Sequence, residues 1–192
     1  MEQKPNMIVF MGGQGSGKGT YAKLLLAQSN ANYIEMGGIL RQMPKDSEIY
    51  KKISRGELLS DNELFPIIAK HIKTDKDLIV DGFPRTLGQA KWLVENYNNK
   101  FIIKVAFLNI SKEMMLARIQ NRIKEGGNRA DDNDITAVQK RIAAFYTTTI
   151  PAIEWLSKQP LQFFDIKLPE DTISANFERV KKRLFESSEK QR

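Results

Sequence analysis

A short apolar run, Met7 to Met11, leads into a glycine-rich stretch and then a helix-like segment. From the end of the apolar run onwards, residues 10–25 read FMGGQGSGKGTYAKLL. Glycine is needed where φ must be positive or where a side chain would block an approaching ligand. The backbone N–H groups of such a loop converge at the positive end of the following helix, and this geometry suits a polyphosphate. The spacing G-x-x-x-x-G-K at Gly12, Gly17 and Lys18 therefore predicts a phosphate-binding P-loop.

One position in this loop departs from the general pattern. Gly19 stands where Ser or Thr usually follows the lysine, and Thr20 comes one position later. Lys18 supplies a mobile positive charge for the outer phosphates. A P-loop does not by itself identify a reaction, because many unrelated activities use one.

Short apolar runs recur along the chain, and helix-like patterns separate them. The predicted strands are Met7 to Met11, Asn32 to Met36, Leu78 to Val80, Phe101 to Leu108 and Leu161 to Ile166. The predicted helices are Thr20 to Gln28, Asp61 to Ile72, Leu87 to Tyr97, Lys112 to Arg122, Asp134 to Leu156 with a kink at Pro151, and Ile173 to Phe185. Continuous apolarity is typical of strands covered on both faces. The order predicts an α/β fold with a P-loop NTPase-type parallel sheet of about five strands and helices on both faces.

Two stretches do not fit this alternation, roughly residues 36–60 and 124–134. Long connections in a compact domain are often functional. We therefore expect moving parts in these two places.

Composition narrows the chemistry that the chain can perform. Its 192 residues suffice for one domain, and it contains no cysteine and a single histidine, His71. Without cysteine there are neither disulfides nor a thiolate metal site, so we expect a reducing compartment and no structural zinc. No apolar segment approaches the roughly 20 residues of a membrane span, and we expect a soluble, cytoplasmic protein.

The net charge of +7 favours anionic partners, which include nucleic acid, acidic membranes and phosphorylated small molecules. Charge does not choose among them. Nucleic-acid binding rests on charge alone, because the sequence has neither interleaved aromatic residues nor a recognisable nucleic-acid module. We expect a phosphorylated small molecule, no nucleic acid and no membrane.

A second motif, DLIVDGFPRTLGQA, occupies residues 77–90. Asp81 follows an apolar strand, and an acidic residue at such a strand end can hold the hydration shell of Mg²⁺ beside the phosphates. Arg85 offers a bidentate fork for another phosphate, and Gln89 offers paired donor and acceptor groups that can read a base edge. The alternative is structural, with Asp81 capping a turn and Arg85 in a surface ion pair.

The two motifs, GGQGSGKGT and DGFPRTLGQA, resemble the adenylate kinase family of nucleoside monophosphate kinases, in which Gly-Thr also follows the P-loop lysine. The resemblance covers nearly the whole chain and continues, in the family's order, in GGILR, RGELLSDNEL, RIQNR, RADDN and QKRI. It implies a single P-loop kinase domain over residues 1–192, with an NMP-binding segment at 35–64 and a short lid at 122–134. It also implies a monomer.

The resemblance assigns roles to individual residues. It implies ATP binding by Gly15, Ser16, Gly17, Lys18, Gly19, Thr20, Arg118 and Arg122. It implies AMP binding by Met36, Arg41, Glu57, Leu58, Leu59, Gly82, Arg85, Gln89, Arg129 and Arg141. The implied catalytic residues are Lys18, Arg85, Arg122, Arg129 and Arg141. Thr20 and Asp81 would hold Mg²⁺, mainly through water, and Asp131 and Asp132 would support the lid arginines.

The implied reaction is the reversible, Mg²⁺-dependent conversion of ATP and AMP to two ADP. Positioning and positive charge suffice for phosphoryl transfer, so the lack of cysteine and the single histidine do not exclude it. A one-residue insertion before the QKRI element leaves Arg141 favoured over Lys140 for the last phosphate contact.

Residues 35–38 depart from the family's Ser-Thr-Gly-Asp and read Glu-Met-Gly-Gly. Met36 cannot make the hydroxyl contact near the acceptor base, and Gly38 deletes a carboxylate. Two alternatives therefore stay open: a kinase for UMP, CMP or GMP, and a nucleotide-binding scaffold with low turnover. An adenine acceptor leads because Gln89 is retained.

Overall fold

The structure is a computed structural model that describes residues 4–55, 57–124 and 135–186. Within these residues a five-stranded parallel sheet has the order β2-β3-β1-β4-β5. The strands are β1 (Asn6–Gly12), β2 (Asn32–Glu35), β3 (Leu78–Asp81), β4 (Ile102–Asn109) and β5 (Gln162–Lys167). The sheet predicted from the sequence is confirmed, with no strand end shifted by more than one residue.

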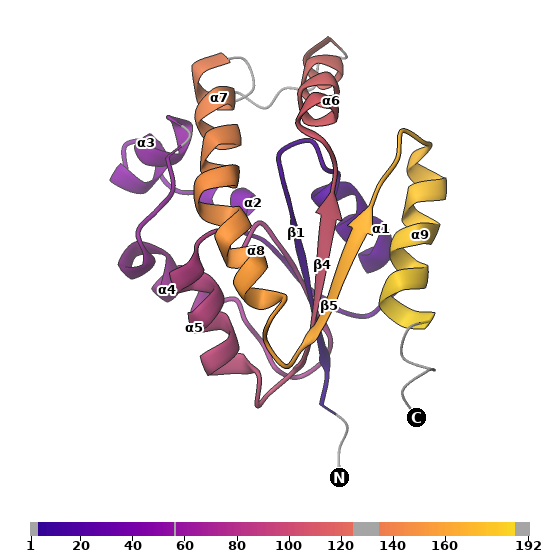
Figure 1. Cartoon of the computed structure of the whole chain (residues 1–192). Helices are drawn as coiled ribbons and strands as arrows, with labels where there is room; N and C mark the ends of the chain where they lie inside the picture. Colours follow the sequence, from indigo (N-terminus) through magenta and orange to yellow (C-terminus); the bar gives the residue numbers. More distant parts are fainter. Residues whose placement is uncertain (1–3, 56, 125–134, 187–192) are drawn as a thin grey trace.

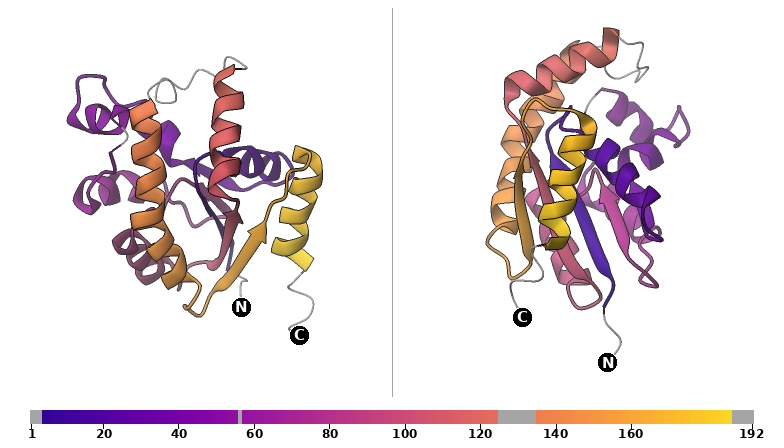
Figure 2. Two further views of the ribbon diagram at one scale, coloured as in Figure 1. Left: turned by 45° about the horizontal axis from the view of Figure 1, so that its top comes forward. Right: turned by 90° about the vertical axis from the view of Figure 1, so that its right-hand side faces the viewer.

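Helices cover both faces of this sheet, as expected for parallel strands joined by crossovers. The helices are α1 (Lys18–Ala27), α2 (Met36–Arg41), α3 (Glu48–Ser54), α4 (Asp61–Ala69), α5 (Leu87–Tyr97), α6 (Lys112–Lys124), α7 (Ile135–Ala144), α8 (Ile150–Leu156) and α9 (Ile173–Phe185). Helices α1 and α9 pack on one face, and α5 and α8 pack together on the other (Figures 1 and 2). None of the helices in the described part of the chain is long and apolar enough to cross a membrane.

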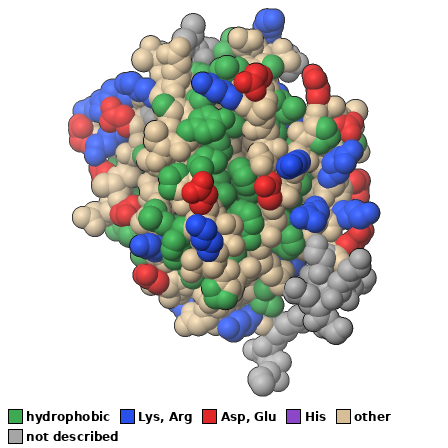
Figure 3. Space-filling model, viewed as in Figure 1, with side chains coloured by type: hydrophobic (Ala, Val, Ile, Leu, Met, Phe, Trp, Pro, Cys, Tyr) green, Lys and Arg blue, Asp and Glu red, His purple; other side chains and the backbone are tan. Residues whose placement is uncertain are grey.

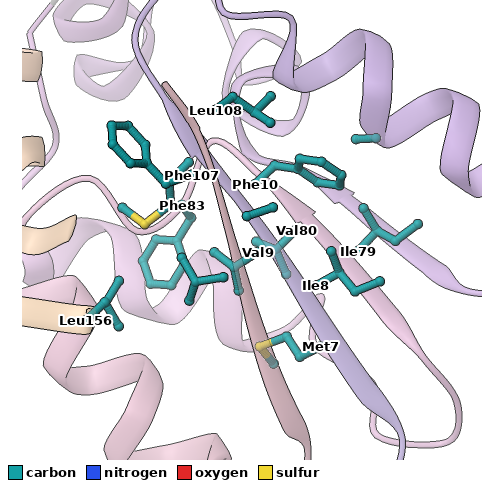
Figure 4. Packing of buried hydrophobic residues seen from close by; sticks show 14 of the residues in the cluster. Met7, Ile8, Val9, Phe10, Ile79, Val80, Phe83, Phe107, Leu108 and Leu156 are labelled. Atoms are coloured by element: carbon teal, nitrogen blue, oxygen red, sulfur yellow. The ribbon is translucent and has the colours of Figure 1, made fainter. Parts of the chain in front are cut away.

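The core lies on both sides of the neighbouring strands β1 and β3. Figure 4 shows Val9 on the same side as Phe83 and Leu156, with Ile8 and Phe10 on the opposite side. Alternate residues of one strand thus enter two apolar layers, and all five of these side chains are buried. Burial on both faces explains why the strands read as continuous apolar runs in the sequence.

The helix predicted over Asp134 to Leu156 is divided by a turn of π-helix, η2 (Phe145–Thr149), between α7 and α8. Pro151, at the start of α8, has no N–H, and its ring crowds the carbonyl group four residues earlier, which disfavours regular α-helix in the turn before it. The hydroxyl of Thr147 donates to the carbonyl of Ala143 at 3.0 Å, which satisfies one of the displaced acceptors. The kink predicted at Pro151 therefore takes the form of a π-helical turn just before the proline.

The irregular stretch expected at residues 36–60 contains two short helices, α2 and α3. An ion pair of 2.7 Å between Lys52 and Glu63 joins α3 to α4. Glu63 also accepts from the backbone N–H of Ser60 at 2.9 Å, within a capping box that begins α4. Lys52 first, and then Ser60, lower the pKa of Glu63 to about 2.

Lys104 is a charged residue buried within β4, 6% exposed. Its ammonium group donates to the carbonyl of Leu184 at the end of α9 (3.1 Å) and lies 5.1 Å from the centre of the Phe185 ring. A cation at this end of the helix also meets the negative end of its dipole. Burial lowers the pKa of Lys104, and the charge of Asp77 partly opposes this shift.

We predict that the stability of the wild type rises relative to that of Lys104→Met as pH increases towards 10.5, the ordinary pKa of lysine. Between the lowered pKa and this value the unfolded chain binds more protons than the folded chain, so the free energy of unfolding increases with pH. Urea unfolding of both proteins across the alkaline range measures the difference. Lys100→Met, at an exposed lysine, is the control. A difference that does not change with pH would contradict the prediction.

Candidate functional site

A cleft of about 1040 Å³ opens at the carboxyl ends of the strands, where open parallel sheets bind their ligands. The P-loop forms its floor, and segments following β2 and β3 form one side. Helices α6 and α7 extend beyond the strand ends and contribute a further wall (Figure 1). The space is large for one mononucleotide, since pockets for small ligands commonly measure about 300–1,000 Å³.

The P-loop has the backbone that its glycines were predicted to provide. Gly17 has φ of 89°, and a Cβ atom there would lie 2.7 Å from Cε2 of Tyr21, whose buried ring packs beneath the loop. Burial raises the pKa of the Tyr21 hydroxyl, and the charge of Arg118 partly offsets this. Both the left-handed φ and the lack of space therefore require glycine at position 17.

Lys18 lies within the loop rather than pointing into solvent. Its ammonium group donates to the carbonyls of Gly12 at 2.6 Å and Gly13 at 2.8 Å, and it lies 3.4 Å from the hydroxyl of Ser16. These contacts hold a positive charge beside the N-terminus of α1. The charge and the helix end act on the same anion.

The departure at Gly19 has a structural reason. A Cβ atom at Gly19 would lie 3.2 Å from a carboxylate oxygen of Asp81, which ends β3 and is 8% exposed. A larger residue would crowd this carboxylate, so the hydroxyl is carried by Thr20, which is exposed and lines the cleft. One carboxylate and one hydroxyl beside a phosphate site suit Mg²⁺, which keeps most of its water.

Arg85 is held by contacts from three directions. Its Nε donates to the carbonyl of Gly82 at 3.0 Å, and its backbone N–H donates to Oε1 of Gln89 at 2.8 Å. The hydroxyl of Thr149, in the π-helical turn, donates to the carbonyl of Arg85 at 2.9 Å. The sequence predicted that Gln89 would offer both a donor and an acceptor to a base. Its oxygen is already used, which leaves the amide NH₂ as a donor.

The segment after β2 lies beside the segment that carries Arg85, on the same side of the cleft. Met36 is buried and lines the cleft, as does Arg41 at the end of α2. Residues 57–59 also line it, and Leu59 is buried whereas Glu57 is exposed. Arg55 first, and Lys140 more weakly, lower the pKa of Glu57, so the end of this segment lies within electrostatic range of α7.

Helices α6 and α7 bring three of the predicted arginines to the cleft. Ile119 of α6 packs with Val138 and Ile142 of α7 in a small apolar cluster. The arginines beside or near this cluster, Arg118, Arg122 and Arg141, all line the cleft. Arg118 also donates to the carbonyl of Gly15 at 3.4 Å, so α6 contacts the P-loop directly.

Lys140 is exposed, whereas Arg141 is half-buried and lines the cleft. This position favours Arg141 for the phosphate contact. Three further predicted residues, Arg129, Asp131 and Asp132, lie outside the described residues.

Sequence reasoning missed several residues at the cleft. Thr149 gave no signal, because its hydrogen bond to Arg85 depends on the π-helical turn. Lys23 and Glu35 line the cleft and form an ion pair of 3.2 Å. Asp171, in the loop between β5 and α9, and Ile173, the first residue of α9, also line it, where the sequence shows only an ordinary helix start.

Comparisons with known proteins identify the family of this chain. A family model described as adenylate kinase matches residues 10–161. An adenylate kinase of Phocaeicola vulgatus is 34% identical over 79% of this chain and 85% of its own length. One of Agrobacterium fabrum is 31% identical over 90% of this chain and 96% of its own.

Among solved structures, a gluconokinase from Sinorhizobium meliloti aligns with a TM-score of 0.68 and 17% identity. The alignment covers 98% of this chain and 97% of that one. At this identity the likeness concerns the fold alone, and it agrees with the P-loop kinase architecture of the sheet.

We predict that Gly17→Ala lowers the free energy of unfolding by about 1–3 kcal/mol, because alanine must adopt a left-handed conformation and displace the Tyr21 ring. Gly38→Ala is the matched control, because its Cβ would meet only ordinary contacts of 3.4 Å or more within α2. That control should be neutral or slightly stabilising. Urea unfolding curves check both, and equal effects of the two substitutions would contradict the argument.

Proposed function

The chain belongs to the adenylate kinase family, and from this premise we propose how its cleft transfers the terminal phosphoryl group of ATP to AMP. It is a phosphotransferase that forms two ADP reversibly. An oxygen of the AMP phosphate forms a bond to the γ-phosphorus, and the bond from that phosphorus to the β–γ bridging oxygen breaks. The observation that carries the proposal is the P-loop facing Arg41 and Arg85 across one cleft.

The residues act by holding the reactants and by supplying positive charge. We assign the donor phosphates to the loop Gly15 to Thr20 and the acceptor phosphate to Arg41 and Arg85. Lys18 leaves the carbonyls of Gly12 and Gly13 for phosphate oxygens, which are stronger acceptors because they are charged. Charge develops on the equatorial oxygens during transfer, and fixed cations stabilise it without a general base.

Arg122 and Arg141 would surround the phosphoryl group in flight, with Arg129 joining them from outside the described residues. Arg118 would contact the donor nucleotide from α6. Asp131 and Asp132, also outside the described residues, would hold these arginines. The support for this assignment is the position of Arg118, Arg122 and Arg141 on the same wall of the cleft.

Mg²⁺ bound with ATP would neutralise the donor phosphates and orient them. We propose that Thr20 and Asp81 hold it, mainly through its water molecules. The closeness of the Asp81 carboxylate to the start of α1 supports this proposal.

AMP is the acceptor that we propose. Gln89 retains an amide donor, which suits a ring nitrogen of adenine, and the apolar side chains of Met36 and Leu59 suit a flat base. Backbone groups of residues 57–59 would complete the base contacts. GMP, UMP or CMP as the acceptor, and a scaffold with low turnover, are the competing possibilities at this subsite.

Two segments, 35–64 and 122–134, would close over the substrates and exclude water, which would otherwise accept the phosphoryl group. We propose that they are inserts in one kinase domain and that the protein works as a cytoplasmic monomer. On the face in Figure 3, basic side chains over α3 and α9 are mixed with acidic ones, which does not favour nucleic acid.

We predict that Lys18→Met lowers kcat by about 10²–10³-fold, the loss typical of removing one group that stabilises transition-state charge. The fold should persist, because the side chain is only partly buried. A coupled assay of ADP formation measures the rate, and a urea midpoint checks folding. Lys73→Met, at an exposed lysine outside the cleft lining, is the control. Normal turnover in Lys18→Met would contradict the mechanism.

Acceptor identity needs its own assay, with ATP, Mg²⁺ and each of AMP, dAMP, GMP, CMP and UMP. We predict the highest kcat/KM for AMP. A higher value for another monophosphate would reassign the acceptor but leave the reaction type. Tight binding of ATP and AMP without ADP formation would favour the scaffold.

A further inference from the structure

We propose that Glu35 is a positioning residue that holds the Arg41 guanidinium ready for the acceptor phosphate. The inference rests on the function proposed above. Glu35 ends β2 at the N-cap position of α2, and its carboxylate contacts two cations instead of the helix end. One oxygen accepts from Nη2 of Arg41 at 3.0 Å, and the other lies 3.2 Å from the ammonium group of Lys23.

The contact leaves Arg41 able to bind an anion. A guanidinium group carries five N–H donors, and Glu35 occupies the Nη2 side only, so Nε and Nη1 remain for phosphate oxygens. Glu35 thus restricts a long side chain that otherwise loses rotamer freedom when phosphate binds. The Arg41 side chain is 41% exposed, so the surrounding protein alone restricts it little. The contact with Glu35 supplies a restriction.

Lys23 keeps the carboxylate from repelling the substrate. A lone carboxylate beside Arg41 would cancel its charge and oppose a dianionic phosphate. Lys23, Glu35 and Arg41 together comprise two cations and one anion, so the net charge beside the acceptor site stays positive. The same carboxylate also joins α1, which carries the P-loop lysine, to α2, which carries Arg41.

Gly38 lies beside the side chain of Glu35. A Cβ atom at Gly38 would lie 3.4 Å from the carboxyl carbon of Glu35 and 3.6 Å from its Cβ and Cγ. A side chain at position 38 would therefore project onto Glu35. Where the family has Ser and Asp at these two positions, this chain has Glu35 and Gly38, so its carboxylate stands at the strand end and not in the first turn of α2.

The expected effect is modest, because an ion pair of this exposure changes an equilibrium constant by no more than about fivefold. Glu35→Ala should raise the KM and the calorimetric Kd for AMP about two- to fivefold. The KM for ATP and the kcat should change little. Glu35→Gln should give a smaller effect, because its amide oxygen can still accept from Arg41. Glu48→Ala, which breaks an exposed ion pair with Lys51 on α3, is the matched control.

A double-mutant cycle distinguishes positioning through Arg41 from a general structural role. If Glu35 acts through Arg41, Glu35→Ala should have no further effect on AMP affinity in an Arg41→Ala background. The double variant Glu35→Ala, Gly38→Asp should recover AMP affinity, because it returns a carboxylate to the same space.

Unchanged AMP affinity in Glu35→Ala, tighter AMP binding, or full additivity with Arg41→Ala would each overturn the inference. If the wild type makes ADP normally, such a result removes only the role of Glu35. If the wild type binds AMP without making ADP, the proposed function fails while the calorimetric affinities still test Glu35. A wild type that binds no AMP would overturn both.

Discussion

The site depends on the convergence of parallel strand ends at one edge of the sheet. Strands β2, β3 and β1 are neighbours, and each ends in a residue or loop that the cleft uses: Glu35, Asp81 and the P-loop. These strands end at Gly12, Glu35 and Asp81, far apart in the sequence, and the parallel register of the sheet places the three ends side by side. The apolar layers on both faces of β1 and β3 keep the edge rigid, so that the polar groups meet at fixed distances.

Backbone groups, rather than acidic side chains, hold much of the positive charge in this cleft. Carbonyls of Gly12 and Gly13 bind Lys18, and the carbonyl of Gly82 binds the guanidinium of Arg85. A neutral carbonyl positions a cation without cancelling its charge. At Arg41 the partner is the carboxylate of Glu35 instead, and Lys23 keeps the net charge of the three groups positive. Preorganised charge of this kind is what phosphoryl transfer requires.

Much of the fold could be predicted from the sequence, because doubly covered strands leave continuous apolar runs and the P-loop has a fixed spacing. The bounds of α5 and α9 agree with the prediction to the residue. Helices α2 and α3 were missed, since they are short and Gly37 and Gly38 weaken the helical pattern. The sequence predicted a kink at Pro151, but not that it takes the form of a π-helical turn or that Thr149 in this turn contacts Arg85. The use of the Gln89 oxygen by a backbone N–H is likewise a tertiary effect.

The central claim is that two nucleotides bind in one cleft with their phosphates facing each other between the P-loop and the arginines. A crystal structure with a dinucleoside polyphosphate, which joins donor and acceptor through one phosphate chain, tests it most directly. The account predicts phosphates along Gly15 to Thr20, continuing to Arg41 and Arg85, with one base near Gln89. A ligand bound elsewhere, or a cleft that stays empty at saturating ligand, would contradict it.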